Sequence, residues 1–143
     1  MIPDPGPLTP GPVSRAAVLA WLAARQPAPP TDLASKLAEC VDAAPEAVLA
    51  GESLPEVVGA LGTWLLESVV ERQKTARDAA PDVGRPAINT SHAPPAGSRR
   101  ESSATALDLL AADAFVTYAF EAASEEGTDV AGLATRLLTT VRA

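Results

Sequence analysis

Apolar residues recur at helical spacing along most of the chain, whereas no stretch alternates between apolar and polar residues for long enough to predict a strand. The clearest local signal is a capping box. Ser53 is placed to accept a hydrogen bond from the backbone N–H of Glu56, and the Glu56 carboxylate is placed to accept one from the N–H of Ser53. Pro55 fits in the first turn, where backbone N–H groups have no partner within the helix. We therefore expect a long helix over residues 53–77.

The apolar surface of this helix is wider than the stripe of about 100° that a surface helix needs. On the helical wheel, two glycines lie on it together with many larger side chains. These residues are Leu54, Val57, Val58, Gly59, Leu61, Gly62, Trp64, Leu65, Leu66, Val69 and Val70. The width predicts either that the helix lies at the centre of a bundle or that one side of it meets another chain.

A second long helix is expected over residues 103–125, with Gly127 just beyond its end. Prolines and capping residues delimit the shorter helices. These are expected from Ser14 to about Gln26, from Thr31 or Asp32 to Asp42, and from Thr128 or Asp129 to Arg142, with one turn over 45–49. The sequence thus predicts an all-α protein, a small helical bundle of about four to six helices with two long central helices.

Proline divides the chain, because it costs about 3 kcal/mol in a helix interior and is absent from most of the two long helical segments. Residues 1–13 are expected to be a disordered Pro-rich arm. Residues 78–102 show no helical or alternating period and are expected to be a flexible linker. This linker separates an N-terminal helical half, residues 14–77, from a C-terminal half, residues 103–143. We expect the two halves to form one domain.

Composition excludes several classes of protein. The net charge of −7 has the wrong sign for a nucleic-acid binder. With one cysteine (Cys40, expected in the core) and one histidine (His92, expected in the linker), a disulfide scaffold, a Cys-based zinc site and a His-pair metal site are excluded. No carboxylate spacing predicts another metal or a cofactor. Because there is no secretory signal and no apolar run of about 18–20 residues, we expect a cytoplasmic protein that is not inserted in a membrane.

Asp108 is the acidic residue whose position invites a functional interpretation. It lies at the middle of the helix face that later carries Phe115, Ala119 and Ala122. A carboxyl group there would be desolvated, its pKa would be raised, and it would mark a site. The simpler interpretation, which we prefer, is that the helix buries this face only after its second turn and leaves Asp108 in water.

One short segment resembles a known family. Residues Leu110 to Glu121 are similar to one internal helix of the trans-isoprenyl diphosphate synthases, over 12 of the 143 residues. Both Asp-rich magnesium motifs of that family are missing, and the chain is too short for its large helical fold. No activity, cofactor or site residue is therefore carried over from the resemblance.

The sequence favours a non-catalytic role, because it contains no motif for nucleophilic or nucleotide-dependent catalysis. The leading hypothesis is a protein–protein interaction or assembly module that self-associates into a homo-oligomer. Small residues let another helix come close, and aromatic residues supply the anchors that interfaces favour. The residues expected at the interface are Gly59, Gly62, Trp64, Leu66, Phe115, Tyr118 and Phe120.

The alternative hypothesis is a small-ligand-binding protein or an enzyme with a pocket between the two long helices. Its polar groups would be Asp108, Asp113, Thr117 and Tyr118, with Trp64 as one wall. A third hypothesis, a peripheral membrane protein, is disfavoured because the polar helix faces are rich in acidic residues rather than in Lys and Arg.

Overall fold

The computed structural model describes residues 13–79 and 96–142, which form five helices and no strand. The helices are α1 (Arg15–Ala23), α2 (Thr31–Ala43), α3 (Leu54–Ala79), α4 (Ala96–Glu126) and α5 (Val130–Arg142). The prediction of an all-α bundle with two long helices is confirmed. Most of the expected arm (1–13) and linker (78–102) lies outside the described residues, namely 1–12 and 80–95 with His92, whereas residues 78–79 of the expected linker belong to α3.

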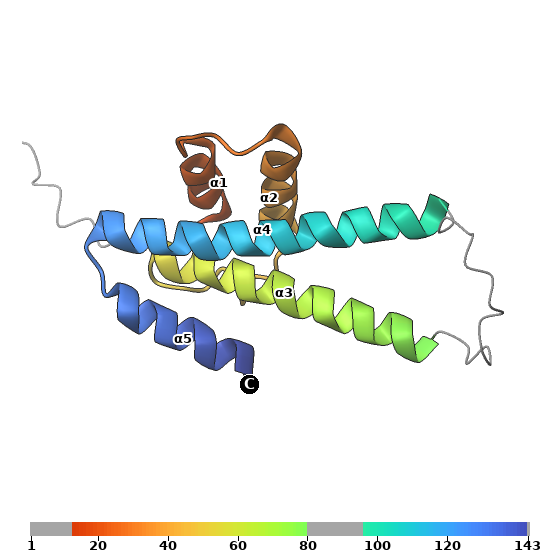
Figure 1. Cartoon of the computed structure of the whole chain (residues 1–143). Coiled ribbons are helices and arrows are strands. Elements are labelled where there is room, and N and C mark those ends of the chain that lie inside the picture. The colour runs from red at the N-terminus through yellow and green to blue at the C-terminus, as the bar shows by residue number, and fades with distance from the viewer. Residues whose placement is uncertain (1–12, 80–95, 143) are drawn as a thin grey trace, which may run out of the picture.

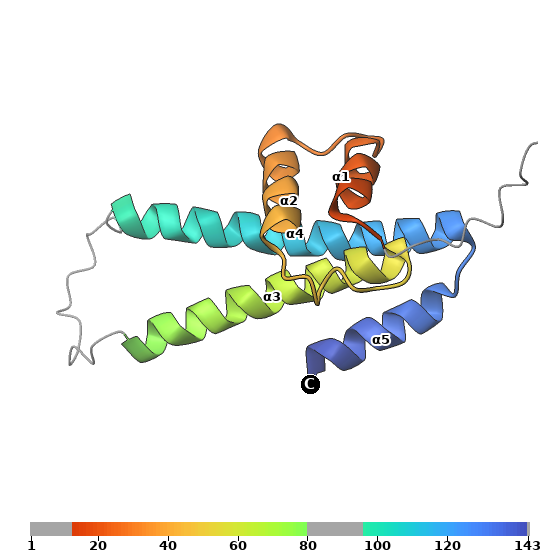
Figure 2. The same ribbon diagram turned by 180° about the vertical axis from the view of Figure 1, so that it is seen from behind.

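The two long helices, α3 and α4, form an antiparallel pair at the centre of the molecule (Figure 1). Views from the front and from behind agree that α1 and α2 lie on one side of this pair and α5 on the other (Figures 1 and 2). We call the end of the pair near Leu54 and Glu126 the base, and the end near Ala79 and Ala96 the tip. With 13 residues against the 31 of α4, α5 runs beside the base half and stops short of the tip.

Local sequence signals set the ends of these helices. The Ser53 hydroxyl accepts a hydrogen bond from the N–H of Glu56 at 3.4 Å, as the capping box predicts. The Glu56 carboxylate accepts from the N–H of Glu52 at 3.2 Å rather than from that of Ser53, so the box closes one residue further back. Gly127 adopts φ 68°, a left-handed conformation that ends α4 and lets the chain turn into α5.

Two helices differ in length from the prediction. α4 begins at Ala96 rather than at 103, so residues 96–102, expected to be linker, are helical. These residues contain no proline, and they show no apolar periodicity that would have predicted a helix. α1 ends at Ala23, three residues before the expected end. Pro27 disfavours the helical conformation at Gln26, which shortens the helix.

The wide apolar surface of α3 is explained by its central place in the bundle, since it contacts α2, α4 and α5. Three of its core side chains, Val57, Val58 and Leu61, are fully buried. Phe115 of α4 is also fully buried and is the largest side chain in the core. Val70, however, keeps 56% of its surface exposed.

Candidate functional site: an apolar cleft beside α5

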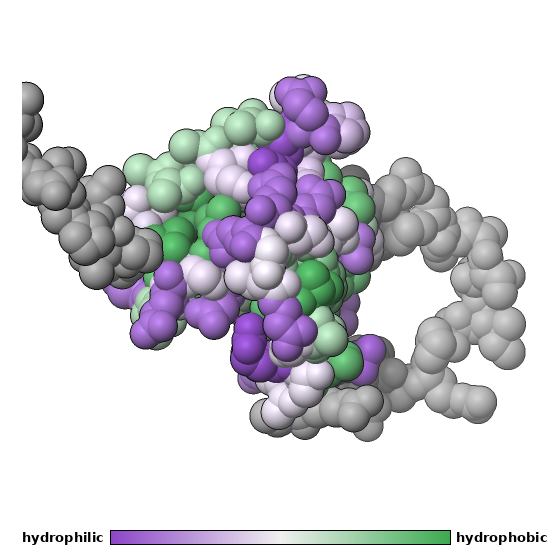
Figure 3. All heavy atoms as spheres, turned by 90° about the vertical axis from the view of Figure 1, so that its left-hand side faces the viewer, coloured by the Kyte–Doolittle hydropathy of each residue, from purple (hydrophilic) through white to green (hydrophobic). Residues whose placement is uncertain are grey.

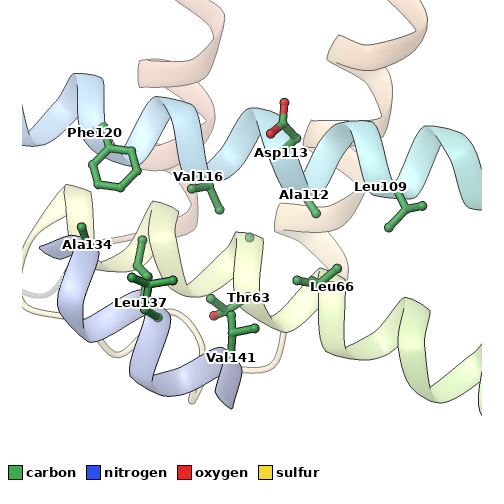
Figure 4. Close-up of a pocket in the computed structure, with 12 residues that line it drawn as sticks. Thr63, Leu66, Leu109, Ala112, Asp113, Val116, Phe120, Ala134, Leu137 and Val141 are labelled. Atoms are coloured by element: carbon green, nitrogen blue, oxygen red, sulfur yellow. The ribbon is translucent and has the colours of Figure 1, made fainter. Parts of the chain in front are cut away.

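An open cleft of about 450 Å³ lies on the side of the α3/α4 pair that carries α5 (Figure 4). α4 forms one wall, α5 forms the other, and α3 lies between them. The lining residues are Gly62, Thr63 and Leu66 of α3, Leu109, Ala112, Asp113, Val116 and Phe120 of α4, and Ala134, Leu137, Leu138 and Val141 of α5.

Two glycines of α3 shape this cleft. A Cβ atom at Gly59 would lie 2.9 Å from Leu137 Cδ2, so the absence of a side chain lets α5 pack closely on α3. A Cβ atom at Gly62 would lie 3.1 Å from the carbonyl oxygen of Ala112, so α3 and α4 are also in close contact there. Of the two glycines, Gly62 lines the cleft, and Gly59 is covered by Leu137 of α5.

The surface of the cleft is almost entirely apolar. Thr63 and Asp113 are its only polar lining residues. The Thr63 hydroxyl donates to the carbonyl of Ala60 at 3.1 Å and is thus satisfied within its own helix. Asp113 is exposed. Exposed apolar side chains on both walls, such as Leu109 at 42% and Leu138 at 56%, make this a surface suited to an apolar occupant.

Asp108 lies outside the cleft, in a buried ionic cluster that joins three helices. Its side chain is 2% exposed, and Nη2 of Arg72 on α3 donates to Oδ2 at 2.6 Å. Nζ of Lys36 on α2 lies 2.7 Å from Oδ1 as an ion pair, without the alignment of a hydrogen bond. Burial raises the pKa of Asp108, but the two cations together outweigh burial and hold its pKa below the ordinary value. The carboxylate in turn raises the pKa of Lys36.

The interpretation that we preferred for Asp108 is therefore wrong, and the other one is correct about burial but wrong about the direction of the pKa shift. The residue is not in water, because α2 packs across α4 at this level and because α4 begins well before it. Its pKa is not raised, because Lys36 and Arg72 compensate the charge. A sequence signal for the cluster exists: Lys36 lies on the buried face of α2, between Leu33 and Cys40, where a lysine needs an acidic partner.

Cys40 is 4% exposed and lies in the core, as expected. Burial raises the pKa of its thiol, and a protonated thiol is a poor nucleophile.

The structure distributes the seven residues expected at an interface over three environments. Gly62, Leu66 and Phe120 line the cleft. Phe115 is in the core, and Gly59 is covered by α5. The other two are aromatic residues, Trp64 and Tyr118, which are half-buried against the core.

The tyrosine contributes to a polar cluster that holds α1 on α4. The ring of Tyr118 packs edge-on against Trp21, with centroids 6.0 Å apart. The Arg25 guanidinium lies 3.8 Å from the centre of the Trp21 ring and bonds Glu125 at 2.6 Å. Seen from the base, hydrophilic residues are prominent and apolar residues show between them (Figure 3). The side chains of this cluster therefore contact one another within the chain.

The residues expected in the alternative pocket are not gathered at this cleft. Of these residues, only Asp113 lines the cleft, while Trp64, Asp108, Thr117 and Tyr118 do not. Sequence reasoning missed Leu109, Leu138 and Val141 as site residues. Their apolar character was visible, but the cleft exists only because of where α5 packs.

No three side chains of His, Cys, Asp or Glu gather as metal ligands within residues 13–79 and 96–142. None of the helices in these ranges is both long and apolar enough to cross a membrane. Comparison of the chain with models of protein families, with curated proteins and with solved structures finds no match.

Proposed function

We propose that the chain is a non-catalytic protein–protein interaction module whose cleft binds the apolar face of an α-helix. The observation that carries the proposal is the cleft itself. Two helices form its walls, and Leu109, Leu138 and Val141 on these walls are 42%, 56% and 50% exposed. An amphipathic helix that docks in such a groove inserts side chains spaced three, four and seven residues apart.

The polarity of the cleft favours a helix over a small ligand. Small-molecule sites combine an apolar lining with several polar groups that converge on the ligand. Here the Thr63 hydroxyl is already bonded to Ala60, which leaves Asp113 as the one charged group among the lining residues that the structure describes. A cleft of this kind selects for apolar surface and shape, with one charge at its edge to orient a partner.

The buried acid Asp108 and the buried thiol Cys40 also favour a non-catalytic role. Asp108 is neutralised by Lys36 and Arg72, and Cys40 is buried with a raised thiol pKa. Neither Asp108 nor Cys40 lines the cleft. Both are better explained as parts of the core.

A fluorescently labelled amphipathic model helix of Leu and Lys residues tests the proposal by fluorescence anisotropy. We expect saturable binding to the wild-type chain, and little binding by the same peptide with Leu replaced by Ala. Leu109→Asp and Leu138→Asp are each expected to weaken binding about 10- to 100-fold, because a buried leucine contributes about 1.5–3 kcal/mol. Leu110→Asp is the matched control, because Leu110 is 51% exposed but does not line the cleft.

Equal effects of Leu109→Asp and Leu110→Asp would contradict the proposal, since binding would then not depend on the cleft. Dodecanoate serves as the probe for a small apolar ligand. If dodecanoate binds the wild-type chain, loses affinity in the Leu109→Asp variant and is not displaced by the peptide, the small-ligand hypothesis replaces the present one.

A further inference from the structure

We infer that the cleft is covered by a second copy of this chain, packed antiparallel so that the tip of each copy lies over the base of the other. This inference rests on the proposed function and names the partner for the same cleft. Three features of the described residues support it: the extent of the apolar surface, the step made by the end of α5, and the order of charges along the face.

The apolar surface continues from the cleft towards the tip. Leu66 lines the cleft, and Val70 lies one helical turn further along the same side of α3, 56% exposed. Beyond Leu66 only Val69 of α3 is buried, and every residue over 70–79 is exposed. The apolar surface of α3 thus extends beyond the cleft by one helical turn, to Val70, and the exposed residues over 71–79 are two alanines and seven polar or charged residues.

The end of α5 makes a step in this face. α5 stands beside the base half of the α3/α4 pair, and its last turns expose Leu138 and Val141. Among residues 13–79 and 96–142, no helix lies beside the tip half on the α5 side. A two-fold axis across the middle of the face would place the α5 of each copy beside the tip half of the other copy. The protruding α5 would then fill the recess beside α3 and α4 of its partner at two equivalent contacts. A parallel copy would oppose α5 to α5 and leave both tip halves bare.

The positions of two charged residues also favour an antiparallel arrangement of the two copies. Asp113 lies four residues beyond Leu109 on α4, and Lys74 lies four residues beyond Val70 on α3. Because the helices run in opposite directions, Asp113 lies about 6 Å from Leu109 towards the base, and Lys74 lies about 6 Å from Val70 towards the tip. Both side chains are exposed. An antiparallel second copy therefore opposes Asp113 of each chain to Lys74 of the other, whereas a parallel copy opposes like charges.

Sedimentation velocity across the micromolar range tests the inference on the full chain. We expect a reversible dimer for the wild type. Leu109→Asp is expected to raise the dissociation constant of the dimer at least 100-fold, because a two-fold symmetric dimer contains each substitution twice. Leu110→Asp is expected to leave the dissociation constant unchanged. Circular dichroism of both variants verifies that the helices are retained.

A charge exchange tests the orientation of the two copies. Asp113→Lys alone and Lys74→Asp alone are each expected to weaken the dimer about tenfold, since each opposes like charges at two symmetric contacts. The double variant D113K/K74D is expected to regain the wild-type dissociation constant, because both contacts are then reversed together. Failure of the double variant to recover would overturn the antiparallel arrangement.

A wild-type chain that stays monomeric throughout, or a dimer that Leu109→Asp leaves intact, overturns the inference. The model peptide then separates the two proposals. If the monomer still binds the peptide through the cleft, the interaction module stands and only the identity of its partner is wrong. If it binds neither the peptide nor itself, both proposals fail.

Discussion

The Asp108→Asn variant is expected to lower the free energy of unfolding by about 2–4 kcal/mol. The substitution keeps the size of the side chain and removes its charge. Asp108 is 2% exposed, and Lys36, whose side chain is 21% exposed, would be left partly buried without its partner. Removing one member of a buried pair costs about 3–5 kcal/mol. The loss that we expect for Asp108→Asn is smaller than this general value, because Arg72 is 61% exposed and its guanidinium can turn towards water.

Urea unfolding, followed by the fluorescence of Trp21 and Trp64, measures this loss. Asp113→Asn is the matched control, because Asp113 lies on the same helix but is exposed, and its effect is expected to stay within about 0.5 kcal/mol. A variant D108N as stable as D113N would refute the reasoning, because the buried carboxylate would then contribute nothing net to stability.

The same variant has a defined pH dependence. The folded-state pKa of Asp108 lies below its ordinary value, so its contribution to stability is complete above an ordinary carboxyl pKa of about 3.9. The contribution is lost as the pH falls from that value towards the folded-state pKa. The stability gap between wild type and D108N is therefore expected to be constant near neutral pH and to narrow in acid. A gap that widens in acid would show that the assigned direction is wrong.

A double-mutant cycle separates the pair from its surroundings. Lys36→Met removes the ammonium and keeps most of the aliphatic stem. The double variant D108N/K36M is expected to be more stable than the sum of the two single losses indicates, because neither charge is then left unpaired. Strict additivity would mean that Lys36 and Asp108 do not interact, despite the 2.7 Å between their charged atoms.

Three further predictions concern packing and accessibility. Phe115→Ala, at a fully buried position, is expected to cost about 3–5 kcal/mol in urea unfolding. Gly62→Ala is expected to lower stability by about 1–3 kcal/mol, because its Cβ would meet a backbone carbonyl of α4 at 3.1 Å. Gly59→Ala is expected to be near neutral in thermal unfolding, because its close contact, at 2.9 Å, is with the flexible end of Leu137, and Ala119 lies at an ordinary 3.6 Å. Cys40 is expected to react with a disulfide reagent at least about tenfold more slowly in the folded chain than in urea, and an equal rate would contradict its burial.

Helix positions were largely predictable because the signals that set them are local. The Ser53 cap and the left-handed Gly127 act on their own or neighbouring backbone groups, so they are visible in the sequence and confirmed in the structure. The tip of α4 escaped prediction for a related reason. Residues 96–102 are helical but show no apolar periodicity, and a periodicity argument detects only helices with one apolar face.

The site was less predictable, because it depends on which faces meet. Apolar residues at Gly62, Leu66 and Phe120 were recognised as surface for a partner, and they do line the cleft. Phe115 was recognised by the same pattern but lies in the core. An apolar side chain in the core and one on a surface for a partner have the same residue types and the same helical spacing. The sequence pattern therefore does not distinguish the two.

The sequence by itself determined that this protein is helical, where most helices begin and end, and that it carries more apolar helix surface than a surface helix needs. Tertiary structure alone decided that α2 brings Lys36 to Asp108 and that α5 packs on α3 and leaves a cleft beside α4. The physical reason is the range of the interactions. Capping and helical periodicity act over about four residues, whereas an ion pair between Lys36 and Asp108, or a cleft between α4 and α5, exists only once distant helices have docked.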